Sequence, residues 1–559
     1  MLRPHILLML CALLCSACAA PASQATSTRA TPTPANAAFV DIPHPGETVE
    51  AAPSPAVPSP SPAAAARALD VALWAPAYLA EGMGAALEAP LRALLVPEEA
   101  GANIRLEVGE SNIVSRWVYA LVTPFHSTLQ GISSTELLQR WQGALSDLPL
   151  LMDSNTYEMF SALWGPAGPG SVEVLPSQDL VEAAWGRGSA LAIVPFERLE
   201  PRWKVLPADG LSPLHKDFVL ENYALTIPIS LGAEPELSAL IRSNFTIPAS
   251  NRDPDKLTVL ALTGVTALVR ATAYAMEQRG MTYPAQDIRG WLLEPDITHI
   301  SNEVPFALDC PFPDPVQADV RFCSRDEAVQ LLEDIEADVV ELTGDHFQDW
   351  GTEAMFHTLD MYRARGWQYY GGGADLAEGR RALFLEHNAN RIAFIGCNAK
   401  GGSFAQAGES QPGAVPCDLE WMEGEIRRLA AEGHLVIATF QHLEYYTYEP
   451  QPDQQRDFRR MAEAGAVVVS GSQAHQPQGM EFLGGSFIHY GLGNLFFDQY
   501  GLCEACRQGL IDRHVFYNGR YLGVELLPIQ FVDYARSRPM TAEEATELFE
   551  ILFQASGWR

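Results

Sequence analysis

The stretch VVVSGSQAHQPQGMEFLGGSFIHYGLGNLFFDQY, residues Val467–Tyr500, decides the fold of the second half of the chain. Val467–Val469 is a β-branched run that predicts a short strand, and a glycine-rich loop containing His475 follows it. A second apolar strand is predicted over Ser486–Tyr490. A side chain that can coordinate a metal therefore comes directly after a strand end, a position that active sites on rigid scaffolds favour.

Strands and helices alternate outward from this stretch, which predicts an α/β fold. A first folded region is expected over residues 68–245 and a second over residues 255–559. In the second region, apolar runs and helical spacing predict strands at Leu257–Leu262, Ile297–Ser301, Val339–Leu342, Ile392–Gly396, Val436–Thr439 and Ala466–Val469, and helices at Val269–Arg279, Glu353–Arg365, Leu419–Glu432, Gln454–Ala464 and Ala542–Gln554. Thr352 is a candidate cap for the second of these helices.

The composition excludes some classes of function. The 559 residues carry 37 lysine and arginine against 69 aspartate and glutamate residues, a net charge of −32. So acidic a chain is a poor candidate for binding nucleic acid or a broad anionic membrane surface. An anionic substrate would need a local metal ion or a cluster of Arg and Lys.

The N-terminus predicts export. Residues 1–17 have a short positive segment and a brief apolar run, as lipoprotein signal peptides do, and Cys18 is the expected lipidated residue. The alternative is ordinary signal cleavage after Ala17 or Ala20. Residues 18–67, rich in Pro, Ala, Ser and Thr, are expected to form a disordered tether. The protein is thus expected on the extracellular face of the cytoplasmic membrane, held by a lipid anchor.

Six cysteines remain after the signal region, which suits disulfides in an exported protein although six allow about 15 connectivities. We predict local pairs: Cys310 with Cys323, Cys397 with Cys417, and Cys503 with Cys506. The spacing of the last pair also suits a zinc half-site or a redox pair, but the chain has no second CxxC.

Potential metal ligands recur just after the predicted strands of the second region. They are Asn302 and Glu303, then Asp345 and His346 with Asp349 one turn on, then His442 and Glu444, and finally His475. Strand ends of an α/β sheet can converge at one edge, and oxygen and imidazole ligands suit Mn, Fe or Zn. Each residue also has an ordinary structural explanation: His346 or His442 as a half-buried histidine with satisfied hydrogen bonds, and Glu303 as a helix cap or a surface charge.

From Leu257 onward the chain resembles the CapA family of capsule-synthesis proteins, linked to poly-γ-glutamate production. The matching pieces are Ser301-Asn302-Glu303, Gly344-Asp345-His346-x-x-Asp349-x-Gly351, Gln441-His442-x-Glu444, Gly471-x-x-x-His475-x-Pro477-Gln478-Gly479 and Tyr490-Gly-Leu-Gly-Asn494-x-x-Phe497-Asp498. The resemblance implies a calcineurin-like metallophosphoesterase fold, with layered β-sheets flanked by helices. It implies metal ligands at Glu303, Asp345, His346, His442 and His475, of which His442, His475 and Asp345 would be catalytic. Asn302, Asp349, Glu444 and Asn494 would support them.

The chain departs from the family pattern at several expected ligands. Val265 stands where the family has Asp after the first strand, and Ser472 stands where an earlier histidine is expected. The Asn-Asn-His block reads Gly344-Asp345-His346. We therefore expect a depleted metal site, with a single ion or an unpaired cluster of carboxylates and histidines.

The first region resembles periplasmic binding proteins of the phosphate type. Trp117–Phe125, Gly131–Ser134 with the helix after it, and Ala190–Phe196 carry this resemblance. Free amides at Ser133-Ser134 would suit an anion, and ordinary helix capping is the alternative.

Two functions follow from the sequence. One is a metal-dependent hydrolase or transferase that acts on an anionic extracellular polymer, with a capsule-export complex as partner. The other is a non-catalytic surface module that binds the polymer or an anion. Val265 and Ser472 favour the second, and the retained histidines favour the first.

Overall fold

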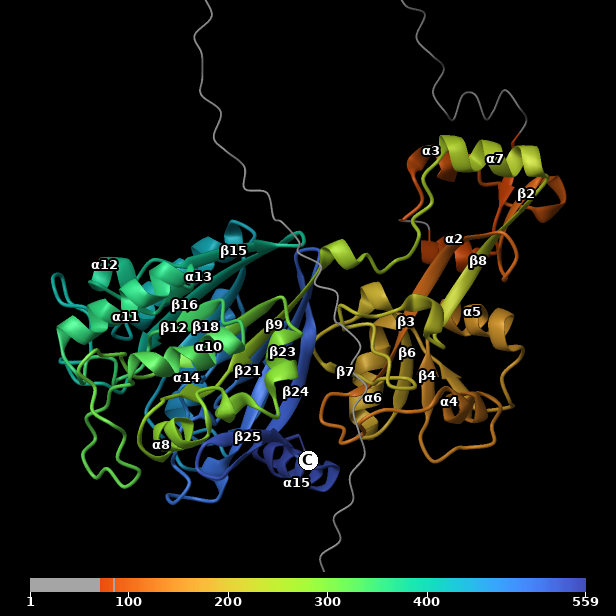
Figure 1. Cartoon of the computed structure of the whole chain (residues 1–559). Coiled ribbons are helices and arrows are strands. Elements are labelled where there is room, and N and C mark those ends of the chain that lie inside the picture. The colour runs from red at the N-terminus through yellow and green to blue at the C-terminus, as the bar shows by residue number, and fades with distance from the viewer. Residues whose placement is uncertain (1–70, 84–85, 559) are drawn as a thin grey trace, which may run out of the picture. The chain divides into compact units, whose positions relative to one another are not determined.

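The computed structural model describes residues 71–83 and 86–558 (Figure 1). The predicted signal peptide, Cys18 and the tether lie outside the described residues. Within the described part, no helix combines the length and apolar character that crossing a bilayer requires.

The first folded part is built on one mixed eight-stranded sheet. Its strands lie in the order β1 (Leu73–Trp74), β2 (Ile104–Val108), β8 (Thr226–Ala233), β3 (Ile113–Pro124), β6 (Leu191–Pro195), β4 (Leu150–Met152) and β5 (Val172–Val174), and β7 (Trp203–Val205) pairs with β3. Its helices are α2 (Ala77–Met83), α3 (Ala89–Arg92), α4 (Ser134–Trp141), α5 (Ser154–Trp164), α6 (Leu180–Arg187) and α7 (Pro235–Asn244).

The amides at the start of α4 already have partners within the chain. Ser133 caps the helix, because its hydroxyl accepts a hydrogen bond from the backbone N–H of Glu136 at 3.1 Å. The backbone N–H of Ser134 donates to Asp209 Oδ1 at 3.0 Å. The structure thus agrees with capping and not with an anion site at this helix end.

The second folded part contains two larger sheets. The nine-stranded sheet runs β13 (Gln368–Tyr370), β12 (Val339–Glu341), β11 (Ile297–Asn302), β9 (Leu257–Thr263), β23 (Gln508–Tyr517), β24 (Arg520–Val532) and β25 (Arg536–Pro539), with β10 (Val265–Thr266) joining β11 to β22 (Asn494–Phe496). The six-stranded sheet runs β15 (Leu383–His387), β16 (Asn390–Asn398), β18 (Leu435–Gln441), β19 (Ala466–Ser470), β21 (Ser486–His489) and β20 (Met480–Leu483). A small ribbon pairs β14 (Gly372–Gly373) with β17 (Gly413–Ala414).

Helices cover the outer faces of both sheets in this part. They are α8 (Arg270–Arg279), α9 (Arg289–Leu293), α10 (Val329–Asp334), α11 (Thr352–Arg365), α12 (Leu376–Gly379), α13 (Leu419–Ala431) and α14 (Pro452–Ala464) (Figure 1). The apolar side chains of α15 (Ala542–Ala555) instead share a core with Leu260 and Phe394, one from each sheet. Side chains of α8 to α11 share a core with one face of the nine-stranded sheet, and those of α13 and α14 share a core with one face of the six-stranded sheet.

The inner faces of the two sheets form a common core. In β9, Leu260 and Leu262 belong to the core between the sheets, whereas Ala261 belongs to the core under the helices. This alternation follows from the two-residue period of a strand. Phe394 of β16 and Ile437 of β18 meet Leu260 and Leu262 from the other sheet. The predicted α/β fold with layered sheets flanked by helices is confirmed.

All five predicted helices of the second part are present, with bounds that differ by no more than two residues. Thr352 is the first residue of α11 and not its cap, because Gly351 takes the N-cap position. The three local disulfides, Cys310–Cys323, Cys397–Cys417 and Cys503–Cys506, are confirmed. Because both sulfur atoms of the Cys503–Cys506 pair are in the disulfide, the structure does not agree with a zinc half-site there.

Candidate functional site

The site lies where several strands of the two sheets end. β11 and β12 run parallel in one sheet, and β16, β18 and β19 run parallel in the other. The residues that follow these strands converge, so side chains far apart in the sequence meet in one place. We call Glu303, Asp345, His346, Glu444 and His475 the ligand cluster.

The ligand cluster consists of two overlapping groups that fit a metal ion. One group is Glu303, Asp345 and His346, and the other is Glu303, Glu444 and His475. Within each group one ligand atom per residue lies within 4.8 Å of the others. Oxygen and imidazole donors at such spacing suit a divalent first-row metal. Glu303 belongs to both groups, which makes it the central carboxylate.

Glu303 is fully buried, and only one of its two carboxylate oxygens has a hydrogen-bond partner. Its Oε1 lies 3.4 Å from Gln441 Nε2, while its Oε2 has no hydrogen-bond partner. Burial raises the pKa of this carboxyl group, and the nearby His475 and His346 oppose that rise. A buried carboxylate oxygen without a partner is costly, and a cation placed there would remove the cost.

His346 is oriented by a carboxylate behind it. Its Nδ1 lies 2.7 Å from Asp349 Oδ2, and its ring packs 4.9 Å from the ring of Phe322. Burial alone would lower the pKa of His346, but the hydrogen bond that its Nδ1–H donates to Asp349 and the charges of Glu303 and Asp345 raise it to about 9. Because Nδ1 is engaged, Nε2 is the nitrogen left for a metal.

Asp345 contacts a lysine that the sequence analysis did not select. Its Oδ2 lies 3.1 Å from Lys400 Nζ, and its Oδ1 accepts from Gln441 Nε2 at 2.7 Å. Burial alone would raise the pKa of Asp345, but Lys400 and His346 hold it below its ordinary value. The Lys400 ammonium also contacts Glu444 Oε1, so it bridges one acid of each group.

His475 is held from both sides of its ring. Nδ1 lies 2.9 Å from Asn494 Oδ1, and Nε2 lies 3.1 Å from Glu444 Oε1. The Asn494 amide also donates to the backbone carbonyls of His475 and Cys506, each at 3.2 Å. Asn494 thus fixes the ring of the histidine that the sequence analysis placed directly after a strand end.

His442 lies outside both groups, which differs from the expectation that it would be a ligand. Its Nε2 is 3.1 Å from Asp457 Oδ2 of α14, and its ring contacts Phe458. The preceding residue, Gln441, points to Asp345 and Glu303. Consecutive residues of an extended chain point to opposite sides, so only one of this pair can face the site.

Two polar residues of the site were missed. Lys400 and Gln441 make the contacts given above. Lys400 follows β16 and Gln441 is the last residue of β18, so the strand-end rule itself would have found both. They were passed over because lysine and glutamine are not common metal ligands.

Gly344 allows the loop after β12 to approach the loop after β11, which carries Glu303. A Cβ at this position would lie 2.8 Å from Glu303 Cα and 3.0 Å from Glu303 Cγ. Any larger side chain would therefore push Glu303 out of place. This explains why this chain has glycine where the resemblance leads one to expect asparagine.

The residues at the other departures from the family pattern have structural contacts and do not face a metal ion. Val265 is buried in a small apolar cluster with Val269, Val304, Phe322 and others. Ser472 turns toward Glu341, which also hydrogen-bonds Thr343 at 2.6 Å. Neither residue supplies a ligand to the cluster. Asn302 instead supports the fold, because its amide donates to Val304 O and Tyr362 Oη, each at 2.7 Å.

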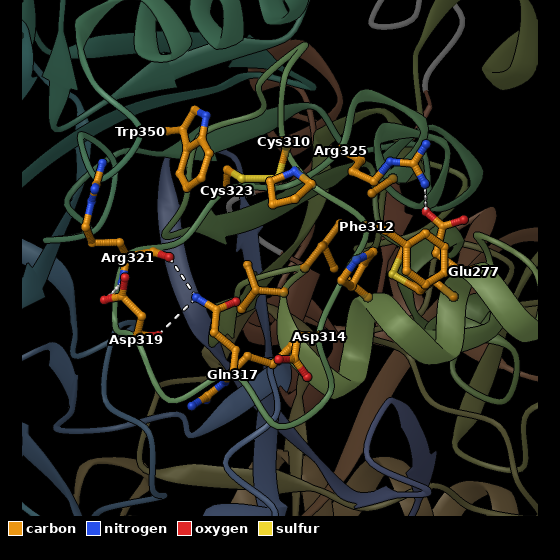
Figure 2. Close-up of a pocket in the computed structure, with 18 of the residues that line it drawn as sticks. Glu277, Cys310, Phe312, Asp314, Gln317, Asp319, Arg321, Cys323, Arg325 and Trp350 are labelled. Carbon is orange, nitrogen blue, oxygen red and sulfur yellow. Dashed lines mark hydrogen bonds and ion pairs between the residues drawn. A yellow bond between two sulfur atoms is a disulfide. The ribbon is translucent and has the colours of Figure 1, made fainter.

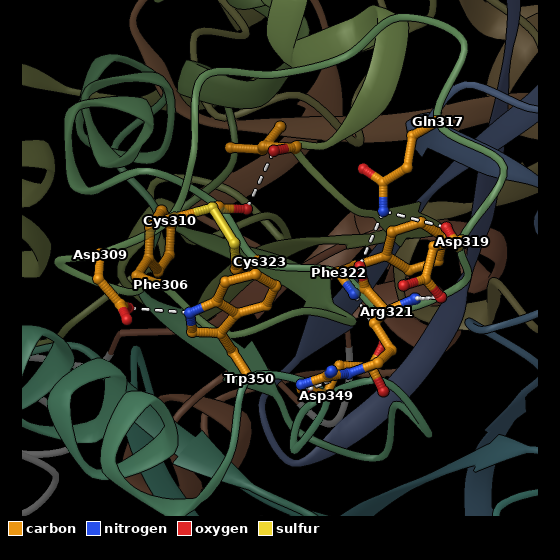
Figure 3. Close-up of a disulfide and its surroundings, with 12 residues drawn as sticks. Phe306, Asp309, Cys310, Gln317, Asp319, Arg321, Phe322, Cys323, Asp349 and Trp350 are labelled. Carbon is orange, nitrogen blue, oxygen red and sulfur yellow. Dashed lines mark hydrogen bonds between the residues drawn. A yellow bond between two sulfur atoms is a disulfide. The ribbon is translucent and has the colours of Figure 1, made fainter.

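A disulfide-closed loop, residues 306–324, forms one wall of the site; we call it the wall loop. The Cys310–Cys323 bond closes it, and the Trp350 indole beside that bond donates to Asp309 at 2.8 Å (Figure 3). Next to Cys323, the backbone N–H of Phe322 donates to Asp349 Oδ2 at 2.9 Å. The carboxylate that orients His346 is thus itself held by the wall loop.

A pocket of about 330 Å³ opens between the wall loop and α8 (Figure 2). Figure 2 shows Phe312 and the Arg325–Glu277 ion pair on one side and Arg321 with Trp350 on the other. Arg270 lines this pocket and also packs on the rings of Phe322 and Phe497 beside the ligand cluster. A cation therefore lies where the pocket and the site adjoin.

Arg270 has a positive φ of 46°, which is uncommon for a residue other than glycine. Its side chain donates to the backbone carbonyl of Asp498, while its Nε is buried without a partner. Backbone strain of this kind concentrates at functional positions.

Comparison with known proteins agrees with the sequence resemblance. Residues 259–499 match the family model described as "Bacterial capsule synthesis protein PGA_cap". The chain is 27% identical over 206 residues to the PGA biosynthesis protein CapA of Bacillus subtilis, a match that covers 36% of this chain and 54% of that protein. It is 22% identical over 306 residues to the capsule biosynthesis protein CapA of Bacillus anthracis, covering 54% and 74% of the two chains. The match thus spans only about half of the first of these relatives.

Two solved structures align with portions of the chain. An ABC-type phosphate transport receptor from Vibrio cholerae aligns with 32% of this chain and 100% of its own, at 10% identity and a TM-score of 0.26. The sulfate thiohydrolase SoxB of Thermus thermophilus aligns with 41% of this chain and 38% of its own, at 15% identity and a TM-score of 0.25.

Proposed function

We propose that the protein takes part in making or anchoring capsular poly-γ-glutamate, because residues 259–499 match the family model described as "Bacterial capsule synthesis protein PGA_cap". We further propose that it is a metal-dependent hydrolase or transferase that acts on this anionic polymer. The observation that carries the proposal is the partnerless, buried Oε2 of Glu303 at the centre of two groups of metal-ligand type.

The residues of the first group fit one divalent ion. Glu303, Asp345 and His346 Nε2 would hold it, and Asp349 behind His346 would keep the ring in place. A bound ion of this type polarises an acyl or phosphoryl oxygen and lowers the pKa of a bound water.

The chain's own residues would bind and orient the polymer. Arg270, at the junction with the pocket, offers a guanidinium to carboxylates of the substrate. His475, paired with Glu444, is placed to hold or deliver a proton. Burial alone would lower the pKa of His475, but Glu444 and Glu303 raise it, so this imidazole retains a proton more readily than a free histidine.

Metal analysis of the purified protein tests the proposal. We expect stoichiometric Mn, Fe or Zn after reconstitution, and a loss of binding in Glu303→Gln and in His346→Ala. Glu481→Gln is a matched control, because Glu481 pairs with Arg459 away from the ligand cluster. His442→Ala is expected to keep its metal, since His442 faces Asp457. Absence of any bound ion in the wild-type protein would end the proposal of metal-dependent catalysis.

A second candidate is a non-catalytic module that binds the polymer at the cell surface. Val265 favours it, because an apolar cluster stands where the family has an acidic ligand. Incubation of poly-γ-glutamate with the metal-loaded protein separates the two candidates. Shortened or transferred chains support the enzyme, and retention of intact polymer on the protein supports the module.

We propose further that the chain is exported and held by a lipid on Cys18 at the extracellular face of the cytoplasmic membrane, next to a capsule-export complex. The signal-like residues 1–17 and the cysteine after them support this. Membrane fractionation of the native protein and of Cys18→Ala tests it. Release of the variant into the medium is expected, and unchanged fractionation would refute the anchor.

A further inference from the structure

We infer that the Lys400 ammonium takes the place of a second metal ion, so that the ligand cluster binds one divalent ion and not two. This inference rests on the proposed function, because it concerns the same ligand cluster and assumes that the cluster binds a metal ion. It assigns a role to a residue that is not itself a metal ligand.

The position of Lys400 carries the inference. Its Nζ lies 3.1 Å from Asp345 Oδ2 and also contacts Glu444 Oε1. Asp345 belongs to one ligand group and Glu444 to the other. The ammonium therefore connects the two groups through Asp345 and Glu444, the acid that each group does not share with the other. Glu303 connects the groups separately, because it belongs to both.

The second group is already satisfied by this lysine. Glu444 Oε1 contacts both Lys400 Nζ and His475 Nε2, and the other nitrogen of His475 is bound to Asn494. An ion entering this group would have to displace the ammonium. In the first group, Lys400 and Gln441 already contact Asp345. Glu303 Oε2 nevertheless has no partner there, and only Nδ1 of His346 is engaged, so this group keeps two open ligand positions.

The lysine is fixed in place by the turn that carries it. Asn398 donates to Thr343 O and to Gln441 Oε1, each at 2.6 Å, and its Oδ1 accepts from the backbone N–H of Gly401. A Cβ at Gly401 would lie 3.0 Å from Asp345 Cβ, so the turn lies directly against the ligand cluster. Lys400 is three-quarters buried and not a mobile surface side chain.

The charges agree with one ion. Glu303, Asp345 and Glu444 bring three negative charges, which one divalent ion and one ammonium balance. A second divalent ion added to the lysine would leave an excess of positive charge in a site that is largely removed from water, where unbalanced charge is costly.

The test is the number of Mn²⁺ ions bound per chain, measured by equilibrium dialysis with elemental analysis. We expect one Mn²⁺ in the wild-type protein and in Lys400→Arg, which keeps the charge. We expect two in Lys400→Ala and in Lys400→Met, the latter keeping most of the side-chain volume. Lys256→Ala is the matched control, because Lys256 forms an exposed ion pair with Asp253 and should leave the stoichiometry at one.

A second readout does not depend on activity. Without metal, Lys400→Met removes the ammonium that contacts Asp345 and Glu444, so its Tm should fall below that of the wild type. Saturating Mn²⁺ should then raise the Tm of the variant more than that of the wild type.

The outcomes separate this inference from the proposed function. Two ions in the wild type would overturn the role of Lys400 and leave metal-dependent catalysis standing. No ion in the wild type would overturn the one-ion stoichiometry and also end metal-dependent catalysis, whatever Lys400→Met binds. One ion in both proteins with equal affinity, or none in either, would overturn the inference.

Discussion

Replacing Gly344 by alanine should damage both the stability of the protein and its metal affinity. The new Cβ would lie 2.8 Å from Glu303 Cα and 3.0 Å from both Glu303 Cγ and the Glu303 carbonyl oxygen. Ordinary contacts of a Cβ begin at 3.4 Å, so one of the two loops must move by several tenths of an ångström. Most of the atoms that the Cβ would meet belong to the backbone, which cannot simply rotate away.

Forced overpacking of this kind costs about 1–3 kcal/mol. In a folded part of this size such a loss lowers Tm by several degrees. The movement also displaces Glu303, the carboxylate common to both ligand groups, and sites of this type need their ligands placed within about 0.5 Å. We therefore expect Mn²⁺ affinity to fall by about 10-fold or more.

Differential scanning fluorimetry and isothermal titration with Mn²⁺ measure the two effects. Gly424→Ala is the matched control, because Gly424 lies inside α13 with open space around its Cβ position. This substitution should stabilise the protein by about 0.5–1 kcal/mol and leave metal affinity unchanged. If Gly344→Ala kept both the Tm and the Mn²⁺ affinity of the wild type, the close approach of the two loops would be refuted.

Four further predictions concern the surroundings of His346. Asp349→Asn should weaken Mn²⁺ binding by about 10- to 100-fold by releasing the imidazole that Asp349 orients, as titration calorimetry would show. Mn²⁺ affinity should rise with pH up to about 9, because His346, whose pKa is raised to about 9, must lose its proton to bind a metal. In the metal-free protein this raised pKa stabilises the fold fully below the ordinary value of 6.5, so thermal melts should show that stability lost as pH rises through about 9. Replacing Cys310 and Cys323 by serine should cost about 3 kcal/mol of unfolding free energy, since their separation of 13 residues closes a sizeable loop.

Each of these predictions has a control within the chain. Asp326→Asn breaks an Asp–His pair outside the ligand cluster, with His357, and should leave Mn²⁺ affinity unchanged. Equal losses of affinity in both aspartate variants would contradict the orienting role of Asp349. Serine at Cys503 and Cys506, only 3 residues apart, should cost less stability than the loss of the longer loop. A Mn²⁺ affinity independent of pH between 7 and 9 would contradict the raised pKa of His346.

Much of the site could be predicted because most of its residues lie directly after the end of a strand. Glu303, Asp345, His346 and His475 each follow a strand whose apolar run is visible in the sequence, and the structure brings all four into the ligand cluster. The alternation of strands and helices likewise predicted the layers, because each strand buries one face under helices and the other against the second sheet.

The ligand set could not be predicted in full, because it depends on the direction in which each side chain points. Gln441 and His442 are adjacent after the same strand, and chemistry alone favours the histidine as a ligand. The structure turns Gln441 toward the site and His442 toward α14. The pleat of the strand decides which of the two side chains faces the site. The sequence does not show which residue of the pair points to which side at the end of the strand. Lys400 was missed for a different reason, since its role arises from contacts with acids distant in the sequence.

Because Glu303 and Asp345 come from one sheet while Lys400, Glu444 and His475 come from the other, the ligand cluster has no existence in either sheet alone. Neither half of the sandwich presents more than a fragment of it before the two have docked. Metal capture would then report on the completion of folding and not on an early step. A chain that stalls with its sheets apart would therefore bring together only part of the ligand cluster.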